Sequence, residues 1–283
     1  MRVRAREVMP RVFEEAPWRL RMGVARRDPA AWLWVSEHVD AEIAEKRRLL
    51  AAAADVARRL PEAETAIAET AELVEAHLAA RHPERAPAAE ADPLLRVGLS
   101  VQEDFCWLAP GADGHRLIAA FVAFPARWRL DEKMARPLAA IHAPVPGFAE
   151  RLLAPSERLL SSLAVERPVQ RANWSIVDDA ALHQPTAGER RDPPHPGAEA
   201  VGQALHLRVE RQTLRRLPAS RVVVFTIHTM VTPLAEIAAA PAAAAALRAR
   251  LREMPDAMRA YKGLADAGGA LDTYLARRAD EGA

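Results

Sequence analysis

Cysteine is almost absent from this sequence, in which Cys106 is the only one among 283 residues. A single thiol excludes a disulfide within the chain, a cysteine-ligated iron–sulfur cluster and a multi-cysteine zinc site. A low cysteine content is typical of proteins in reducing compartments. The basic N-terminus has no apolar segment behind it, which a secretory signal would need. We therefore expect a cytoplasmic location.

Long apolar runs and an excess of one charge are also missing. No stretch of about 18 apolar residues suggests a membrane span, and 39 Lys and Arg are balanced by 38 Asp and Glu to a net charge of +1. Nucleic-acid-binding proteins usually carry a clear positive excess or interleaved exposed aromatics, and aromatic residues make up only 5% of this chain. The composition predicts a globular protein that has neither a membrane nor a nucleic acid as its partner.

The common catalytic signatures are missing as well. The sequence contains no GxGxxG, no P-loop, no GxSxG and no HExxH, and its nine histidines form no HxxxH pair. These absences exclude the usual nucleotide-binding, serine-hydrolase and zinc-protease sites. Function therefore has to be sought in single residues and their neighbours.

Hydrophobic periodicity divides the chain into three predicted regions. Residues 1–93 form a helical region that packs on the core, and residues 233–283 form C-terminal helices. Residues 94–232 form the central domain, in which short alternating or apolar runs predict strands. The fold class that follows is α+β, an antiparallel sheet with central helices, flanked by N- and C-terminal helices. A hairpin, then helices, then further antiparallel strands is the order of a PAS-like sheet.

The single elements follow from capping residues, prolines and the period of the apolar positions. Asp28 and Pro29 begin one helix that ends at Pro61, and a further helix ends at His142. The Pro- and Gly-rich residues 184–202 predict a loop that is long enough to be functional. The other expected elements are helices over 62–82 and 149–164, a hairpin around the turn GADGH, and strands over 94–101, 168–178, 204–217 and 221–233.

His142 is the first candidate for a functional residue. It follows Leu138 by four positions and Met134 by eight, so the three side chains share one helix face. Pro144 and Pro146 stop the helix directly behind it, which holds the imidazole at a helix end above an apolar face. Such a place suits an axial ligand of haem iron, whose second ring nitrogen binds a carbonyl or carboxylate. A histidine that only caps the helix or fills the core fits the same spacing.

The strand over 204–217 carries the second group of candidates. Alternation places His206 and Glu210 on one face, so His206 is a candidate iron ligand or proton-transfer group if that face lines a pocket. Arg211 and Arg215 belong to a basic cluster whose guanidinium groups can pair with carboxylates, including haem propionates, or with phosphate. A solvated strand edge with ion pairs is the alternative reading of this cluster.

Two other predicted strands hold candidates of a different kind. In RANWSI, Trp174 can wall a flat cofactor and Asn173 can hydrogen-bond oxygen or an amine, although a strand Trp is also an ordinary core residue. In QEDFCWL, the acidic pair could hold an ammonium group. Cys106 is there a candidate thiolate ligand or nucleophile, but its aromatic neighbours favour a small buried hydrophobe.

Five blocks of the sequence stand in an order that is more specific than any one motif. They are VQEDFCWL, FPARWRLDEKMARPLAAIHAPVPGF, RANWSI, LRVERQTLRRLP and VVFTIHTMVTPL, which together span about residues 94–235. In this order they resemble the haem-dependent oxidative N-demethylase family. The resemblance implies a PAS-like fold with a b-type haem that activates dioxygen and oxidises a small secondary amine, such as dimethylamine, to formaldehyde and the shorter amine.

The resemblance also implies an electron supply and roles for single residues. Electrons would come from NADPH through FMN and a [2Fe-2S] centre, and because this chain lacks the cysteines for that centre, a separate reductase partner would be required. The expected site residues are then His142 as metal ligand, Glu210 and Asn173 as catalytic groups, and, holding the cofactor together with His142, Arg211, Trp174, Arg215 and His206.

Three positions depart from the family pattern. His228 and Met230 stand where a basic residue and an aromatic are expected, and His206 stands where an aromatic is common. If these side chains face the haem, the substrate or the reaction differs from demethylation. The alternative to an enzyme is therefore a PAS-like haem sensor without turnover, in which His206 or His228 is a sixth iron ligand. A structural module built on the helical ends is the third hypothesis.

Overall fold

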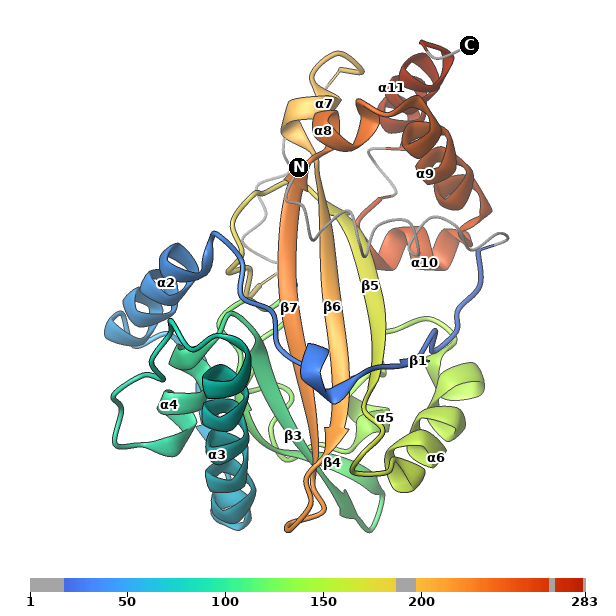
Figure 1. The fold of residues 1–283 in the computed structure, drawn as a ribbon. Coiled ribbons are helices and arrows are strands. Elements are labelled where there is room, and N and C mark those ends of the chain that lie inside the picture. The colour runs from blue at the N-terminus through green and yellow to red at the C-terminus, as the bar shows by residue number, and fades with distance from the viewer. Residues whose placement is uncertain (1–17, 187–196, 265–267, 282–283) are drawn as a thin grey trace.

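The centre of the fold is one antiparallel sheet of seven strands, in the order β1-β5-β6-β7-β3-β4-β2 (Figure 1). The computed structural model describes residues 18–186, 197–264 and 268–281. The strands are β1 (Ala25–Arg26), β2 (Ala57–Arg59), β3 (Asp104–Gly111), β4 (Gly114–Phe121), β5 (Val169–Val177), β6 (His206–Arg216) and β7 (Val223–Pro233).

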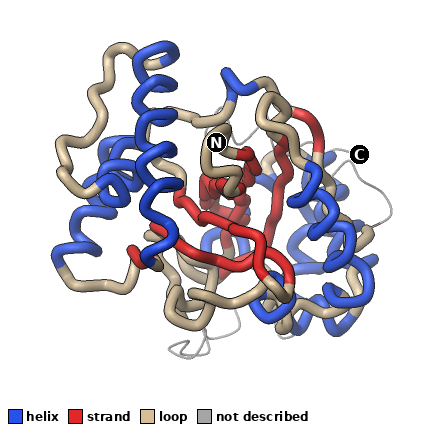
Figure 2. Tube along the Cα trace, turned by 90° about the horizontal axis from the view of Figure 1, so that it is seen from below, coloured by secondary structure: helices blue, strands red, loops and turns tan. Residues whose placement is uncertain are grey.

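Helices lie on both sides of these strands (Figure 2). In the described part of the chain none of them is long and apolar enough to cross a membrane. The α-helices are α2 (Val39–Ala51), α3 (Glu64–Arg81), α4 (Pro93–Ser100), α5 (Leu138–Ile141), α6 (Ala154–Ser162), α7 (Val201–Ala204), α8 (Leu234–Ala238), α9 (Pro241–Glu253), α10 (Asp256–Tyr261) and α11 (Gly268–Asp280). A π-helical turn, Ala149–Leu153, leads into α6, and 3-10 turns are formed by Pro29–Ala31 and Pro61–Ala63.

The two faces of the sheet bury different apolar clusters. On one face, the N-terminal helices pack over β3 and β4, and the C-terminal helices pack over β6 and β7. On the opposite face, α5, α6 and the turn between them pack over Cys106, Leu214 and Phe225. The prediction of an α+β fold with an antiparallel sheet and flanking helices is confirmed. The division at residues 93 and 232 and the PAS-like label stay predictions.

The predicted helix from Asp28 to Pro61 is wrong. Asp28 does cap a helix start by accepting a hydrogen bond from the backbone of Ala30, but only one 3-10 turn follows. Arg211 donates hydrogen bonds to the carbonyls of Ala31, the last residue of that turn, and of Trp32 directly behind it, and the chain then runs without helix to residue 36. These tertiary contacts override the helical spacing of the apolar residues. Only α2 keeps the predicted helix, and β2 follows it as an edge strand on β4.

The predicted strand over 94–101 is wrong for a different reason. Asp92 accepts a hydrogen bond from the backbone N–H of Leu94, and Pro93 occupies the first helical turn. This pair of residues is a helix-start signal, because proline lacks the N–H that would otherwise be unsatisfied there. The segment is therefore α4, whose apolar side packs against α3 and the sheet.

The remaining elements of the central region were predicted correctly in kind. The hairpin is β3–β4, and the three later strands are β5, β6 and β7, paired along their whole lengths. The helix before His142 is much shorter than predicted, since only Leu138–Ile141 is helical. Most of the predicted loop over 184–202 lies at 187–196, outside the described residues.

Candidate functional site

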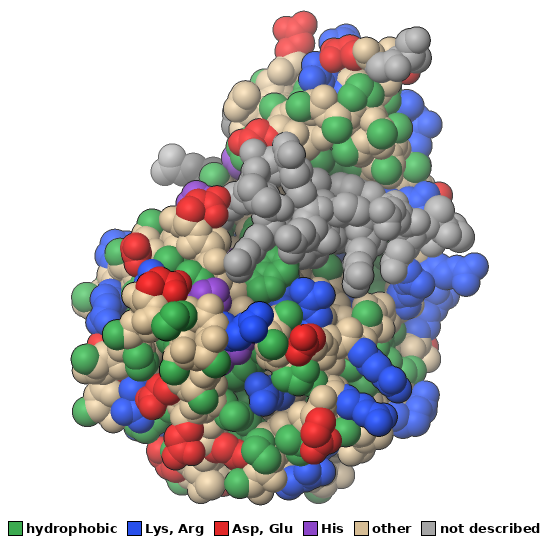
Figure 3. Space-filling view, viewed as in Figure 1, with side chains coloured by type: hydrophobic (Ala, Val, Ile, Leu, Met, Phe, Trp, Pro, Cys, Tyr) green, Lys and Arg blue, Asp and Glu red, His purple; other side chains and the backbone are tan. Residues whose placement is uncertain are grey.

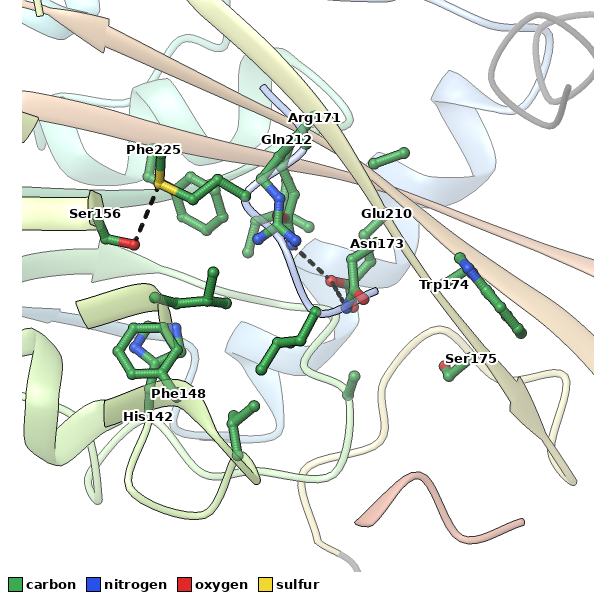
Figure 4. Close-up of a pocket in the computed structure, with 18 of the residues that line it drawn as sticks. His142, Phe148, Ser156, Arg171, Asn173, Trp174, Ser175, Glu210, Gln212 and Phe225 are labelled. Atoms are coloured by element: carbon green, nitrogen blue, oxygen red, sulfur yellow. Dashed lines mark hydrogen bonds between the residues drawn. The ribbon is translucent and has the colours of Figure 1, made fainter. Parts of the chain in front are cut away.

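A cavity of about 1240 Å³ lies between the sheet and the segment that runs from α5 to α6 (Figure 4). This volume exceeds the roughly 300–1,000 Å³ of ordinary small-molecule pockets. Alternate residues of four strands form its floor, as strand geometry requires, because every second side chain points to the same face. They are Cys106, Leu108, Arg171, Asn173, Ser175, Glu210, Gln212, Leu214, Phe225 and Ile227.

The opposite wall of the cavity carries His142. It is the C-cap residue of α5, and its Nδ1 lies 3.0 Å from the carbonyl oxygen of Leu138. Gly147 adopts a φ of 75°, which turns the chain so that the ring of Phe148 stacks on the imidazole with centroids 4.3 Å apart. The helix end and the stacked ring together fix the position of the imidazole.

The two nitrogens of His142 therefore have separate roles. The contact to Leu138 is a hydrogen bond when Nδ1 carries the proton, and this tautomer leaves the lone pair on Nε2. Among the described residues Nε2 has no hydrogen-bond partner. Burial lowers the pKa of His142; the hydrogen bond to Leu138 opposes this shift in part, and the charges of Lys133 and Arg171 add to it. The ring is thus held neutral, which is the form that binds a metal.

The floor of the cavity carries a polar cluster around Glu210. Its Oε2 accepts hydrogen bonds from Asn173 at 3.4 Å and from Gln212 at 3.0 Å. Its Oε1 lies 3.4 Å from Nε of Arg208, a buried residue that also donates to the carbonyls of Leu182 and Phe124. A carboxylate offers about four acceptor positions, of which three are used here. One acceptor position of Oε1 is left for a further donor.

The cavity lining is strongly cationic. Eight of its residues are Arg or Lys and two are Glu. Arg and Lys side chains also gather on the side of the molecule where β1 and α6 lie (Figure 3). Arg171 lies on the floor next to Gln212, and Lys262 donates a hydrogen bond to the carbonyl of Trp174. An occupant with negative groups would therefore be favoured.

Lys262 gives this lining a measurable pH signature. Burial lowers the pKa of its ammonium group to about 8, against the partly compensating charge of Glu210. Because the unfolded chain holds this proton up to a higher pH, the lysine costs stability at neutral pH, and this cost falls as the pH rises from about 8 towards 10.5. We expect the difference in free energy of unfolding between wild type and Lys262→Met to shift in favour of the wild type across that range. Urea unfolding at a series of pH values measures it, and a constant difference would contradict the assignment.

The sequence-predicted site residues separate into two groups. His142, Asn173 and Glu210 line the cavity, Trp174 borders it from the other face of β5 (Figure 4), and Cys106 lines it as a buried thiol whose pKa is raised by burial. Thiolate chemistry at neutral pH is not expected of such a group. The second group, Arg211, Arg215 and His206, lies outside the cavity lining.

Arg211 lies on the opposite face of the sheet, fully buried. Its guanidinium donates to the carbonyls of Ala31 and Trp32 and to the side chain of Gln170, and it stacks over the ring of Trp34. It also lies 3.8 Å from the buried carboxylate of Glu103. The expected role of Arg211 as a propionate partner finds no support in this position, which instead ties the N-terminal segment to the sheet.

The structural role of Arg211 is testable by Arg211→Met. Loss of the guanidinium leaves two buried carbonyls and the charge of Glu103 without it, so we expect unfolding to become easier by about 3–5 kcal/mol. The matched change Arg47→Met, at an exposed side chain, should cost about 0.5 kcal/mol or less. Urea unfolding measures both. If Arg211→Met were as stable as the wild type but lost haem binding, Arg211 would have to be a residue that binds the cofactor.

Arg215 and His206 are the other two predicted site residues that lie outside the cavity lining. Arg215 stacks over the ring of Trp32, 4.8 Å from its centroid, on the same face as Arg211. His206 begins β6 opposite Val177, with a buried Nδ1 that has no hydrogen-bond partner. Neither position supports contact with an occupant of the cavity.

His228 and Met230, the two residues of β7 that depart from the family pattern, lie on the face of the sheet opposite the cavity. His228 lies 3.3 Å from Glu103 and packs against Trp34. Met230 belongs to the cluster under the C-terminal helices. Neither residue is among those that line the cavity.

Among the cavity residues that the sequence analysis missed, three matter for the polar floor: Arg171, Gln212 and Lys262. Arg171 and Gln212 each lie two positions from a residue that was chosen, Asn173 and Glu210, so strand alternation could have found both. Lys262 comes from the C-terminal region, and no local pattern connects it to the strands. Its place beside Trp174 is a tertiary contact only.

The chain matches the model of a known protein family. The model of the family described as haem-dependent oxidative N-demethylase, alpha subunit-like, matches residues 84–271. The matched range includes His142, the strand residues of the cavity floor and Lys262, and it covers more than half of the chain. The chain belongs to the haem-dependent oxidative N-demethylase, alpha subunit-like family.

Proposed function

We propose that this chain is a haem-dependent oxidative enzyme that removes a methyl group from a small secondary amine. The observation that carries the proposal is the position of His142, a neutral imidazole with a free Nε2 on the wall of a large cationic cavity. Family membership supports the haem, and the carboxylate of Glu210 supports an amine as substrate. NADPH, FMN and a [2Fe-2S] centre on a separate partner would supply the electrons, as the resemblance implies.

The residues present fit a b-type haem. His142 would hold the iron through Nε2 while the carbonyl of Leu138 orients the ring, the arrangement usual for haem and metal histidines. The excess of Arg and Lys in the lining matches the two negative propionates, and the apolar residues Leu138, Ile141 and Phe148 suit the flat macrocycle. When bound, the haem would supply the activation of dioxygen.

Glu210 would hold the amine. Its free acceptor position can take one N–H of the substrate ammonium, and Asn173 and Gln212 fix the carboxylate so that it need not reorganise. The same carboxylate can accept the proton that an ammonium loses before its nitrogen can be oxidised. The apolar residues Leu108, Phe225 and Ile227 on the floor would keep water away from this pair.

The decisive experiment is turnover. Purified protein loaded with haem, and supplied with dioxygen and a reducing partner, should release formaldehyde from dimethylamine. Haem binding without formaldehyde from any secondary amine would reject the enzyme and favour the haem sensor. No haem binding would reject both.

A further inference from the structure

The guanidinium of Arg171 is the one strongly charged group on the cavity floor for which no partner is found among the described residues. Its Nε is buried without a hydrogen bond, and no oxygen of an acidic side chain lies within the 4.0 Å that defines an ion pair. Arg208, Arg211 and Arg216 in the neighbouring strand are each paired with backbone carbonyls. The Arg171 side chain is half-buried and the charge of Glu210 acts on it only from a distance. Because a guanidinium partly removed from water without a partner is unfavourable, its place in the cavity indicates that an anion binds there.

Arg171 and Glu210 stand side by side on the floor (Figure 4). In the register of β5 and β6, Arg171 is opposite Gln212 and Asn173 is opposite Glu210. The two charged residues are thus diagonal neighbours, about 7–8 Å apart along the sheet. Both side chains line the same cavity, yet they do not pair with each other. One small molecule can therefore contact both.

We propose that Arg171 and Glu210 form the two ends of a site for a zwitterionic secondary amine, an N-methylated amino acid, whose carboxylate binds Arg171 and whose ammonium binds Glu210. A guanidinium binds a carboxylate through two parallel hydrogen bonds, which fixes the orientation of the bound molecule. As the identity of the substrate, this inference rests on the proposed function. As a binding site, it stands on the strand register and the unpaired guanidinium.

Lys262 adds a second positive charge to the lining of the same cavity. Its ammonium group donates a hydrogen bond to the carbonyl of Trp174 on β5, the strand that also carries Arg171. Two cations and one carboxylate leave this part of the floor with a net positive charge. Dimethylamine, which has no anionic group, would leave Arg171 without a partner, whereas an N-methylated amino acid would satisfy both ends.

A haem propionate is the other carboxylate that could bind Arg171, and a matched pair of amines distinguishes the two sources. N-methylglycine and N-ethylmethylamine share the N-methyl ammonium group and the methylene next to it, and only the first has a carboxylate. Calorimetric titration of the protein, with and without haem, gives the affinity for each. We expect wild type to bind N-methylglycine about ten- to a hundredfold more tightly, the range of a hydrogen bond to a charged group.

The variant Arg171→Gln should remove this preference and leave the affinity for N-ethylmethylamine almost unchanged. The control Arg158→Gln, at an exposed position on α6, should keep it. Two results would overturn the inference: equal affinities of wild type for the two amines, or a weaker haem affinity in Arg171→Gln with the amine preference intact, which would assign Arg171 to a propionate. Neither result depends on turnover, so the inference and the proposed function can fail separately.

Discussion

Replacing His142 with glycine should abolish the Soret absorption of the haem-loaded protein. The variant keeps the backbone turn but removes the only histidine nitrogen that lines the cavity in the described part of the chain. Loss of an axial ligand removes the bond that holds the iron. Added imidazole, which is the missing side chain as a free molecule, should restore the band by filling the space beside Phe148. Absorption spectra with increasing imidazole measure both effects.

His82 provides a matched control for this change. It is also a histidine at the C-cap of a helix, α3, but it lies outside the cavity lining. His82→Gly should therefore bind haem as the wild type does. An unchanged spectrum of His142→Gly would show that His142 is not the iron ligand. Loss of the Soret band in both variants would indicate a general effect of glycine at a helix end.

Replacing Glu210 with glutamine should lower turnover of a secondary amine by about a hundredfold to ten-thousandfold, the usual range for loss of a proton-transfer group. Glutamine has the same shape, and its amide oxygen can still accept hydrogen bonds from Asn173 and Gln212. It cannot, however, accept the ammonium proton. The haem spectrum should stay the same, because Glu210 is on the wall opposite His142. Formaldehyde release and the absorption spectrum, measured on the same sample, separate the two effects.

The control for Glu210→Gln is Glu166→Gln, which changes an exposed carboxylate after α6. It should leave turnover unchanged. Full activity in Glu210→Gln would mean that the amine is bound and deprotonated elsewhere in the cavity. A loss of haem together with activity would mean that Glu210 supports the cofactor through Arg208.

The strands of the site were predictable and their surroundings were not. Alternation in RANWSI and LRVERQTL puts Asn173 with Arg171 and Glu210 with Gln212, since side chains two positions apart share a face. The sequence does not say which face meets His142. Arg211 was therefore chosen for a cofactor role although its face is covered by the segment with Trp32 and Trp34.

The errors at the N-terminal end have the same origin. Apolar residues at helical spacing around Trp32 predicted a long helix, but Arg211 and Glu103 bind the backbone of this segment, and only one 3-10 turn forms there. These partners are 69 and about 180 positions away in sequence. Contacts between residues so far apart cannot be predicted from local spacing or capping residues. The capping residues Asp28 and Asp92, by contrast, can be recognised in the sequence itself.

The central claim is that one haem binds in the cavity with His142 as its protein ligand. The most direct measurement is the absorption spectrum of purified wild-type protein titrated with haem, first alone and then with a secondary amine. The claim predicts a Soret band that saturates at one haem per chain and shifts when the amine binds. A titration without a saturating band, or a band that does not respond to any secondary amine, would contradict it.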